Sequence, residues 1–417
     1  MWNLTEKKKM GKEEKKPNPI YLVSDLLEEI LLQLPLKSIL RFKTVSKQWR
    51  STLESRWFAE RRMKLQKNRK ILAAGDHRTK RRFEGDEEID MVYLHCDDAT
   101  RPSLTCDGLV CIPLPDSVTV LNPTTGESLR FPSGPAPPVT HRYDYLFHRG
   151  FWWNAFPGFY AMGFGKDKVN GSYKVVRMFY DPNIYCEILD MNIGVWRKSN
   201  PPPYVVDARR KSACVNGSIY WLELGANFTI LALDLHTEEF RNVRRPPKCY
   251  YSDQVLNFED RLAVASTNSE CFWKLEIRCL DAQEKLWSLT HCISLVQVAS
   301  PGSRKVWFRP VAVSKKGNVF FHDNDKKLFK YYPKTRRILC LSRDIHVIAP
   351  FVENLVPLPR PSLTSGYQSG FRYLEHASSF QIPKIFRSIK SQIPNILVTT
   401  TFVSLVMLGV FVVRSKS

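Results

Sequence analysis

Residues that could carry chemistry are scattered along the 417-residue chain. The glycine-rich stretch Gly163 to Lys166 (GFGK) lacks the spacing of a phosphate-binding P-loop. His95 stands beside Cys96 and His322 beside Asp323, but isolated pairs of this kind are more typical of a satisfied surface or core residue than of a metal ligand. No nucleophile elbow, zincin or deaminase motif occurs. We therefore predict a protein that is not an enzyme and that needs no cofactor.

The 10 cysteines form neither a metal-binding nor a disulfide pattern. None of them stands in a C-x-x-C pair, and none has a histidine at a zinc-ligand spacing. No apolar signal-peptide core lies near the lysine-rich start of the chain. We expect reduced and mostly buried thiols in the cytoplasm or nucleus, and no metal site.

Net charge is the strongest compositional signal, because 62 Lys and Arg residues against 41 Asp and Glu residues give +21. A charge of this size favours anionic partners, which include nucleic acid, acidic proteins and membrane surfaces. The basic residues gather in residues 7–16 and again in residues 61–82. The first cluster also contains Glu13 and Glu14, so residues 1–19 are interpreted as a disordered basic arm rather than a nuclear address.

The elements that would position a binding site begin with Leu22 to Trp49, where apolar residues recur at helical spacing. Asp25 is suited to cap a first helix, with Glu28 as its capping-box partner. Pro35 ends that helix, and Ser46 is suited to cap a third one. Three helices in about forty residues rarely bury enough surface to be stable alone, so we expect a partner to cover the exposed leucines.

This stretch resembles the F-box. The resemblance rests on residues 25–31 (DLLEEIL), 34–35 (LP), 37–42 (KSILRF) and 45–50 (VSKQWR). One departure is visible, because the family usually opens with Leu-Pro, whereas Leu22 is followed here by Val23. The resemblance places an F-box at residues 20–65.

A partner and a set of site residues are implied by the resemblance. It implies binding to a Skp-type adaptor and, through that adaptor, to a cullin ubiquitin ligase. Carried over by position, the candidates that face the adaptor or form the F-box core are Leu22, Leu26, Ile30, Leu34, Pro35, Leu36, Leu40, Val45 and Trp49. The alternative is an ordinary three-helix packing unit without a partner.

Residues 66–103 are interpreted as a basic and acidic linker with one strand near Met91 to Leu94. Ser55 to Lys70, which spans the end of the F-box and the start of this segment, is predicted to form a helix that braces the F-box against the rest of the chain. The acidic run Asp86 to Glu88 is expected to oppose the arginines that precede it.

Residues 104–350 carry short β-branched and aromatic runs between turn residues, which is typical of an all-β domain. A strand, a turn with a polar opening and a return strand recur at residues 118–130, 186–197, 229–241, 275–288 and 328–339. Further strand pairs with a glycine at the hairpin occur at 212–222 and 311–322. The turn openings are mostly spaced near the ~40–50 residues of a propeller blade, so irregular propeller blades are predicted.

The same region resembles the F-box associated domain of plant F-box proteins, a propeller-like family related to kelch repeats. The resemblance rests on residues 106–110 (CDGLV), 122–126 (NPTTG), 163–167 (GFGKD), 173–177 (YKVVR) and 215–221 (VNGSIYW). In that family the associated domain is taken to hold the substrate. No residue-level binding pattern transfers, so the substrate-binding residues are unknown.

The end of the chain is read as a linker at residues 351–395 followed by an uncharged run at 396–413 (ILVTTTFVSLVMLGVFVV). About 18 apolar residues make a helix about 27 Å long, enough for a thin membrane core. Basic residues flank both ends, so this run predicts a single-pass transmembrane tail anchor on the cytosolic face of a membrane. The alternatives are a buried helix packed on the propeller and a strand-like segment.

The predicted fold class is α+β multidomain, with a small three-helix F-box, an all-β propeller-like domain and a C-terminal apolar helix. The predicted function is the substrate-recognition subunit of a Skp-cullin-F-box E3 ubiquitin ligase, with an unknown protein substrate. One alternative is a membrane-tethered interaction scaffold whose F-box does not engage an adaptor because of Val23. The other is a basic nucleic-acid-binding protein, although no specific nucleic-acid motif occurs.

Overall fold

The structure is a computed structural model that describes residues 24–359 with internal gaps. The gaps are residues 67–68, 75–82, 95–102, 115–116, 133–159, 181–183, 209, 225–228, 249, 251, 269–272, 282, 284–285 and 299–305. The predicted basic arm at 1–19, Leu22 and the predicted anchor at 396–413 therefore lie outside the described residues.

Four short helices open the described part of the chain: α1 (Ser24–Gln33), α2 (Leu36–Phe42), α3 (Lys47–Glu54) and α4 (Arg56–Leu65). Pro35 separates α1 from α2, as its missing amide donor predicts. Ser46 caps α3 by accepting a hydrogen bond from the amide of Trp49 at 3.1 Å, which confirms the predicted cap. Ser55 caps α4 in the same way through the amide of Phe58 at 3.2 Å. The bracing helix predicted at Ser55 to Lys70 forms α4 only as far as Leu65, and Lys70 lies in the strand β1 (Arg69–Ala74).

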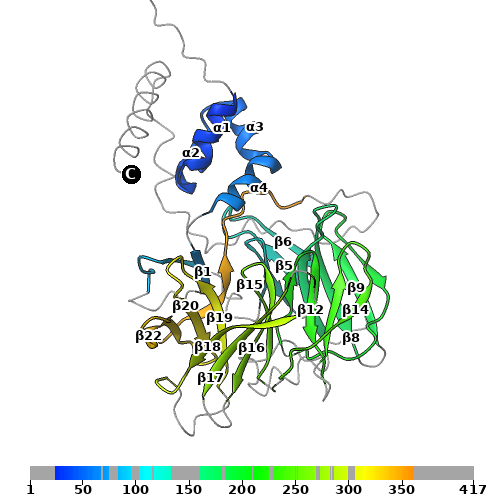
Figure 1. Cartoon of the computed structure of the whole chain (residues 1–417). Coiled ribbons are helices and arrows are strands. Elements are labelled where there is room, and N and C mark those ends of the chain that lie inside the picture. Colours follow the sequence, from blue (N-terminus) through cyan, green and yellow to red (C-terminus); the bar gives the residue numbers. More distant parts are fainter. Residues whose placement is uncertain are drawn as a thin grey trace, which may run out of the picture.

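Five four-stranded antiparallel sheets and one three-stranded sheet come after the helices, and they form the six blades of a β-propeller below them (Figure 1). Blade 1 is β3 (Leu104–Cys106), β4 (Leu109–Pro113), β5 (Ser117–Leu121) and β6 (Ser128–Pro132). Blade 2 is β7 (Tyr160–Lys166), β8 (Tyr173–Phe179), β9 (Tyr185–Asp190) and β10 (Val195–Ser199). Blade 3 is β11 (Ala213–Val215), β12 (Ser218–Leu222), β13 (Ile230–Asp234) and β14 (Phe240–Val243).

The remaining blades complete the ring. Blade 4 is β15 (Gln254–Phe258), β16 (Arg261–Asn268), β17 (Lys274–Leu280) and β18 (Trp287–Ser294). Blade 5 is β19 (Phe308–Val313), β20 (Val319–Asp323), β21 (Leu328–Tyr332) and β22 (Arg337–Ser342). Blade 6 is β2 (Ile89–Leu94), β1 (Arg69–Ala74) and β23 (His346–Phe351).

The sequence repeats correspond to defined parts of these blades. Each of the five predicted repeats forms the third and fourth strands of one of blades 1 to 5, for example β5 and β6 in blade 1. The two predicted hairpins are the first two strands of blade 3 and of blade 5. Local turn chemistry was therefore sufficient to locate these pairs, because a hairpin joins neighbours in sequence.

Blade 6 corrects the interpretation of residues 66–103 as a linker. β1 lies in that segment and pairs parallel with β2 and antiparallel with β23, about 280 residues later in the chain. Asp86 and Glu88, which were expected to oppose the preceding arginines, form ion pairs with Lys330 of blade 5 at 2.7 and 3.2 Å. The first and last strands thus share one sheet and close the ring.

The core of the propeller consists of clusters of buried side chains between neighbouring blades. Trp221, which is 1% exposed, lies in the cluster between blades 2 and 3 and donates its indole hydrogen to the carbonyl of Met162 at 2.8 Å. Comparable clusters join blade 1 to 2, 3 to 4, 4 to 5, 5 to 6, and 6 to 1. Each sheet therefore covers the apolar face of the next one.

The end of the described chain also differs from the sequence interpretation of residues 351–395 as a linker. Phe351 ends β23, and Leu355 and Leu358 after it are both buried. No helix within the described residues is both long and apolar enough to cross a membrane.

Candidate functional site

The helical domain has a compact core that includes a residue from the far end of the chain. Leu31, Ile39, Leu53 and Phe58 are fully buried in this core, and Leu355 joins them from beyond the last strand. Such a small unit gains stability from this shared core, because four short helices alone bury little apolar surface. The helices lie on one end of the propeller (Figure 1).

The predicted adaptor candidates divide into two groups. Leu34, Leu36, Leu40 and Trp49 are half-buried and pack against the core of the helical domain. The second group lies outside that core cluster and consists of Leu26, Ile30, Pro35 and Val45. Leu26 is 53% exposed and Val45 is 58% exposed. The structure thus separates residues that hold the domain together from residues that lie outside its core.

The helical spacing of the apolar residues in α1 does not separate one side of the helix from another, whereas the structure divides these residues into two rows. Leu27 and Leu31 point into the core, whereas Leu26 and Ile30 lie beside them and remain accessible. Residues four apart on a helix share a side, so two parallel apolar rows run along α1. The inner row is used by the fold, and the outer row remains partly exposed.

An ion-pair cluster fixes α4 to the segment that leaves the propeller. The guanidinium of Arg62 donates to the carbonyls of Leu32 and Leu34 at 3.0 and 2.9 Å, and it also pairs with Glu353 at 3.3 Å. Lys70 of β1 pairs with the same carboxylate at 2.5 Å. A single glutamate therefore ties together the end of α1, helix α4 and the first strand of the propeller.

The connecting segment, residues 352–358, is also bonded to blade 1 of the propeller. The amide group of Asn354, which is fully buried, donates to the carbonyl of Asp107 at 2.8 Å. The side chain of Asn122 donates to the Asn354 carbonyl at 2.9 Å, and the hydroxyl of Thr124 accepts from its amide at 2.9 Å. The CDGLV and NPTTG motifs of blade 1 thus supply the groups that hold the connecting segment.

Replacing Glu353 by alanine is expected to lower the stability of the helical domain by about 1–3 kcal/mol, because a hydrogen-bonded charge partner is lost while Arg62 stays buried. Hydrogen exchange of the α4 amides should be faster in this variant. The control is Glu54→Ala, which removes a more exposed ion pair to Lys43 at 3.6 Å and should change exchange very little. Unchanged protection of α4 in Glu353→Ala would show that the cluster does not hold the helix.

The glycine-rich stretch Gly163 to Lys166, which lacks the spacing of a phosphate-binding loop, has a packing role. A Cβ on Gly163 would lie 2.5 Å from the ring of Trp221, and one on Gly165 would lie 2.6 Å from the sulfur of Cys214. Both contacts are shorter than real Cβ atoms show, so the glycines let blade 2 approach blade 3 closely.

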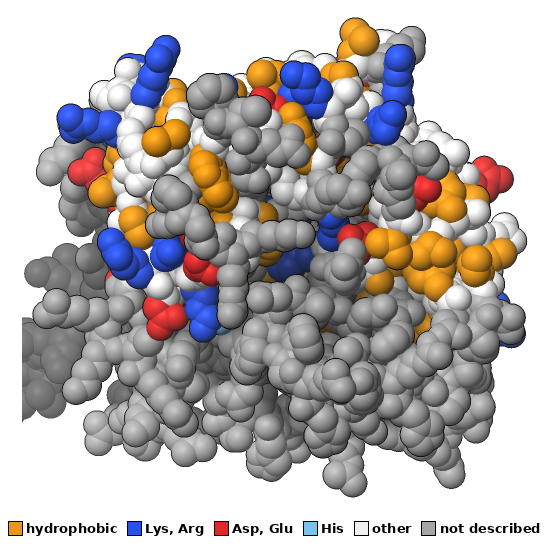
Figure 2. Space-filling view, turned by 90° about the horizontal axis from the view of Figure 1, so that it is seen from below, with side chains coloured by type: hydrophobic (Ala, Val, Ile, Leu, Met, Phe, Trp, Pro, Cys, Tyr) orange, Lys and Arg blue, Asp and Glu red, His pale blue; other side chains and the backbone are white. Residues whose placement is uncertain are grey.

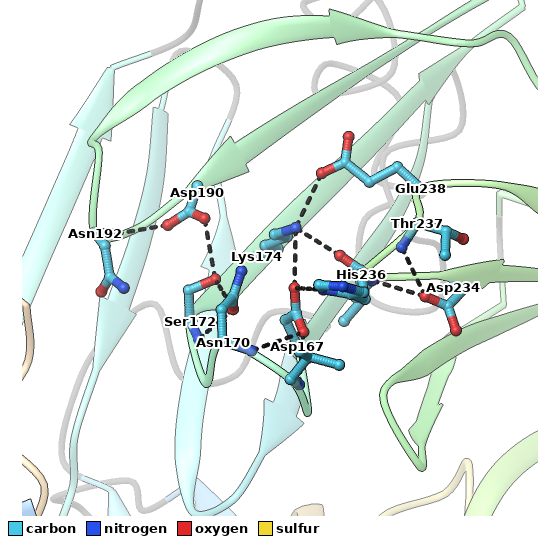
Figure 3. A network of polar contacts seen from close by, with 12 residues as sticks. Asp167, Asn170, Ser172, Lys174, Asp190, Asn192, Asp234, His236, Thr237 and Glu238 are labelled. Carbon is cyan, nitrogen blue, oxygen red and sulfur yellow. Dashed lines mark hydrogen bonds and ion pairs between the residues drawn. The ribbon is translucent and has the colours of Figure 1, made fainter.

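A buried polar network extends from the same stretch (Figure 3). The ammonium of Lys174 lies 3.3 Å from a carboxylate oxygen of Asp167 and 2.9 Å from one of Glu238. Burial alone would raise the pKa of Asp167, but the amides of Val169 and Asn170 and the nearby ammonium outweigh it and lower that pKa. The network therefore stabilises the junction between blades 2 and 3 through paired charges, because the charged groups of Lys174, Asp167 and Glu238 contact one another.

Within the described residues no three of His, Cys, Asp and Glu gather closely enough to hold a metal ion. His322 is buried, and burial lowers its pKa to about 3, so it is neutral near pH 7. Its Nδ1 lies 3.0 Å from the carbonyl oxygen of Asp323. His95 and Cys96 lie outside the described residues.

Sequence reasoning missed the connecting segment. Its members Glu353, Asn354 and Leu355 come after a strand and precede a proline-rich stretch, which is a typical linker pattern. The available signal was the apolar composition of residues 351–359 (FVENLVPLP), in which only Glu353 and Asn354 are polar. Apolar residues in a predicted linker do not reveal by themselves that the segment packs on another domain, because the residues that they contact lie far away in the sequence.

Comparisons with known proteins agree with this architecture. Residues 21–61 match the F-box domain, and residues 78–344 match the F-box associated beta propeller domain. Neither description names an enzyme. Among similar proteins of Arabidopsis thaliana, F-box/LRR-repeat protein At2g43260 is 52% identical over 85% of this chain and 87% of its own length. F-box/kelch-repeat protein At2g43445 is 46% identical over 96% of this chain and 98% of its own length.

The two matched regions coincide with the helical domain and with most of the propeller described above. The identity to the Arabidopsis relatives extends over both domains, so the resemblance seen in single motifs holds for the chain as a whole. The chain belongs to the family of plant F-box proteins in which an F-box is followed by an F-box associated β-propeller domain.

Proposed function

We propose that this protein is the substrate-recognition subunit of a Skp-cullin-F-box ubiquitin ligase. In this role the F-box binds a Skp-type adaptor, and the propeller holds a protein target for ubiquitination. The protein then performs no chemistry itself, because it raises the local concentration of the target near the ligase.

The observation that carries this proposal is a set of accessible apolar residues of the F-box, which includes the outer row of α1. Leu26 and Val45 are more than half exposed although both are apolar, and Ile30 and Pro35 lie outside the core cluster with them. Apolar side chains that a small domain leaves uncovered are typical of a protein interface. The described F-box core does not need these residues, so we assign them to the adaptor.

The contacts that fix the F-box to the propeller support the proposal that the propeller holds a target for the ligase. Helix α4 is held by Glu353, and the connecting segment is held by Asp107, Asn122 and Thr124 of blade 1. A receptor must present its target at a defined distance from the ligase, and a buried, hydrogen-bonded junction restricts the relative motion of the two domains.

Replacing Leu26 by aspartate is expected to weaken adaptor binding by about 30-fold or more, since a charge then faces an apolar partner surface. Folding should be retained because Leu26 is 53% exposed. The measurement is binding of the full chain to purified Skp-type adaptors by calorimetry or surface plasmon resonance.

The matched control is Leu224→Asp, which introduces the same charge at a leucine of the propeller that is 51% exposed. This variant should bind the adaptor as the wild type does. If Leu26→Asp and wild type bound equally well, the outer row of α1 would not be the adaptor surface. Absence of binding by the wild type to every adaptor would instead favour the scaffold whose F-box does not engage an adaptor.

The other functions considered from the sequence stay predictions. The membrane-tethered scaffold depends on residues 396–413, which lie outside the described residues. The nucleic-acid-binding alternative depends on the net charge of +21. It requires nucleic-acid binding that falls steeply with salt concentration.

A further inference from the structure

The central channel of the propeller carries basic side chains at the end opposite the F-box. Strands β3 and β4 turn at Asp107 and Gly108 on the F-box side, so the first strands of the blades begin at the far end. Lys211 precedes β11, Gln254 begins β15 and Arg309 lies at the start of β19. We name these three residues the channel site. In Figure 2, which views this far face, basic side chains lie set back near its middle.

The channel site is built by contacts across the ring. The guanidinium of Arg309 donates to the side-chain oxygen of Gln254 and to the carbonyl of Val255, both at 3.0 Å, which joins blade 5 to blade 4. The ammonium of Lys211 lies 3.4 Å from the carbonyl of Ile348, which joins the start of blade 3 to blade 6. All three side chains are half-buried. Four of the six blades therefore fix the positions of the donors.

These donors are not neutralised by the described part of the protein. Every acceptor that Lys211 and Arg309 contact there is an uncharged oxygen. The side-chain nitrogen of Gln254 is buried and has no hydrogen-bond partner among the described residues. A guanidinium, an ammonium that is mostly protonated below about pH 7, and one unused amide donor in a confined space attract an anionic oxygen group.

Among the described residues no carboxylate contributes to the pKa shift of Lys211 or of Arg309, although Asp253, next to Gln254, is buried beside Arg210. Burial, and then the charge of Arg309, lowers the pKa of Lys211 to about 7. His322 of β20 and His346 of β23 face the same space, and burial lowers the pKa of each of them. Both imidazoles are therefore neutral near pH 7. Trp307 lies beside this group, with its ring centroid 5.8 Å from that of His322.

We propose that the channel site binds a carboxylate of the target protein, presented by an acidic side chain or a C-terminus in an extended segment. This inference rests on the proposed function as a substrate receptor, and it names the chemistry by which the propeller selects its target. An extended chain fits because the three side chains are only half-exposed within the ring, so a narrow segment reaches them more readily than a folded surface. The channel site is far from the F-box, so adaptor and target bind at opposite ends.

The test uses the full chain and two pools of fluorescent heptapeptides with amidated C-termini. One pool has a fixed central glutamate and randomised neighbours, and the other has glutamine at that place. A third pool with neutral side chains and a free C-terminus separates the terminal carboxylate from the side-chain carboxylate. We expect the wild type to retain one of the two carboxylate pools about tenfold or more over the glutamine pool, which corresponds to about 1.4 kcal/mol.

Replacing Lys211 by methionine should abolish this preference. The variant is expected to fold, because it removes a charge from a half-buried position and keeps the aliphatic stem. The control is Lys334→Met, which changes an exposed lysine in the turn between β21 and β22. That control should retain the carboxylate pool as the wild type does.

Binding should also depend on pH in a defined direction. Lys211 has a pKa of about 7, so its ammonium is mostly present at pH 6 and mostly absent at pH 8. A peptide carboxylate remains ionised over this range, and Arg309 remains charged. We therefore expect wild-type affinity to fall by up to about tenfold from pH 6 to pH 8, and this fall should be absent in Lys211→Met.

Three outcomes would overturn the inference. Equal retention of all pools by the wild type would show that no carboxylate is recognised. A preference that survives in Lys211→Met would place recognition elsewhere. Binding of inorganic phosphate without any selectivity among the pools would identify a small-ion site instead. Adaptor binding by the same proteins is measured in parallel, so failure of the channel site and failure of the ligase role are recognised separately.

Discussion

Replacing Lys174 by methionine is expected to lower the free energy of unfolding by about 3–5 kcal/mol, because breaking a buried ion pair leaves an uncompensated charge. Asp167 is completely buried, and Lys174 is 4% exposed. The ammonium also donates to the carbonyl of Leu235 at 2.5 Å, so that acceptor loses its partner as well. Denaturant unfolding at pH 7 is the measurement.

The pH dependence of this effect has a definite sign. Asp167 and Glu238 both have a pKa that is lowered from ordinary values of 3.8 and 4.5, although burial alone would raise it. Their stabilising contribution is present above the ordinary values and is lost as the pH falls through the lowered ones. Lys174→Met should therefore be most damaging near neutral pH, and its deficit should shrink in acid.

Two further variants separate charge from packing. Lys198→Met changes an exposed lysine of β10 and should shift stability by no more than about 0.5 kcal/mol. Adding Asp167→Asn and Glu238→Gln to Lys174→Met removes the two carboxylates that have lost Lys174, of which Glu238 still pairs with Arg197, and should recover much of the loss. If the triple variant were as unstable as the single one, lost packing rather than unpaired charge would be the cause.

Replacing Gly163 by alanine should cost about 3 kcal/mol, at the upper end of overpacking effects, because both neighbours are constrained. The added Cβ would lie 2.5 Å from the Trp221 ring and 2.9 Å from the side chain of Ile219. The indole cannot shift freely, since its nitrogen is bonded to the carbonyl of Met162. Thermal or denaturant unfolding measures the loss.

Gly317→Ala separates crowding from backbone strain. Gly317 has a φ of +82° and no atom within 4 Å of its would-be Cβ, so this variant meets strain without crowding. It should cost about 1 kcal/mol. The Gly163 variant should in turn be partly rescued by Trp221→Phe, since the smaller ring makes room for the methyl group. An equal cost for both glycines would argue against close blade packing at Gly163.

The helices of the F-box could be predicted because their signals are local. Pro35 and Ser46 mark the helix boundaries where the structure has them, since a missing amide donor and a capping hydroxyl act on their own turn. The accessible outer row on α1 could not be separated from the inner row. Leu26 and Leu27 look alike in sequence, and only packing against α4 and Leu355 decides which one is buried.

One hairpin in each of blades 1 to 5 was also predictable, and so was the first hairpin of blade 3, where Asn216 and Gly217 have the positive φ values that tight turns require. Each of these signals involves residues adjacent in sequence. The glycines of the GFGK stretch were visible as well, but their role depends on Trp221 of another blade. Residue type alone does not reveal such a partner.

The sequence by itself determined the order of the F-box and the propeller, the helix boundaries at Pro35 and Ser46, and the third and fourth strands of five blades, since each depends on residues a few places apart. Asp25, predicted as the cap of the first helix, lies within the first turn of α1 instead. Only the tertiary structure decided how the ring closes, where the F-box contacts the propeller and which basic residues meet in the channel. β1 pairs with β23, Leu355 enters the F-box core, and Lys211 and Arg309 come from separate blades. The free energy of such distant contacts comes from burial and charge pairing across the folded chain, which no local pattern encodes.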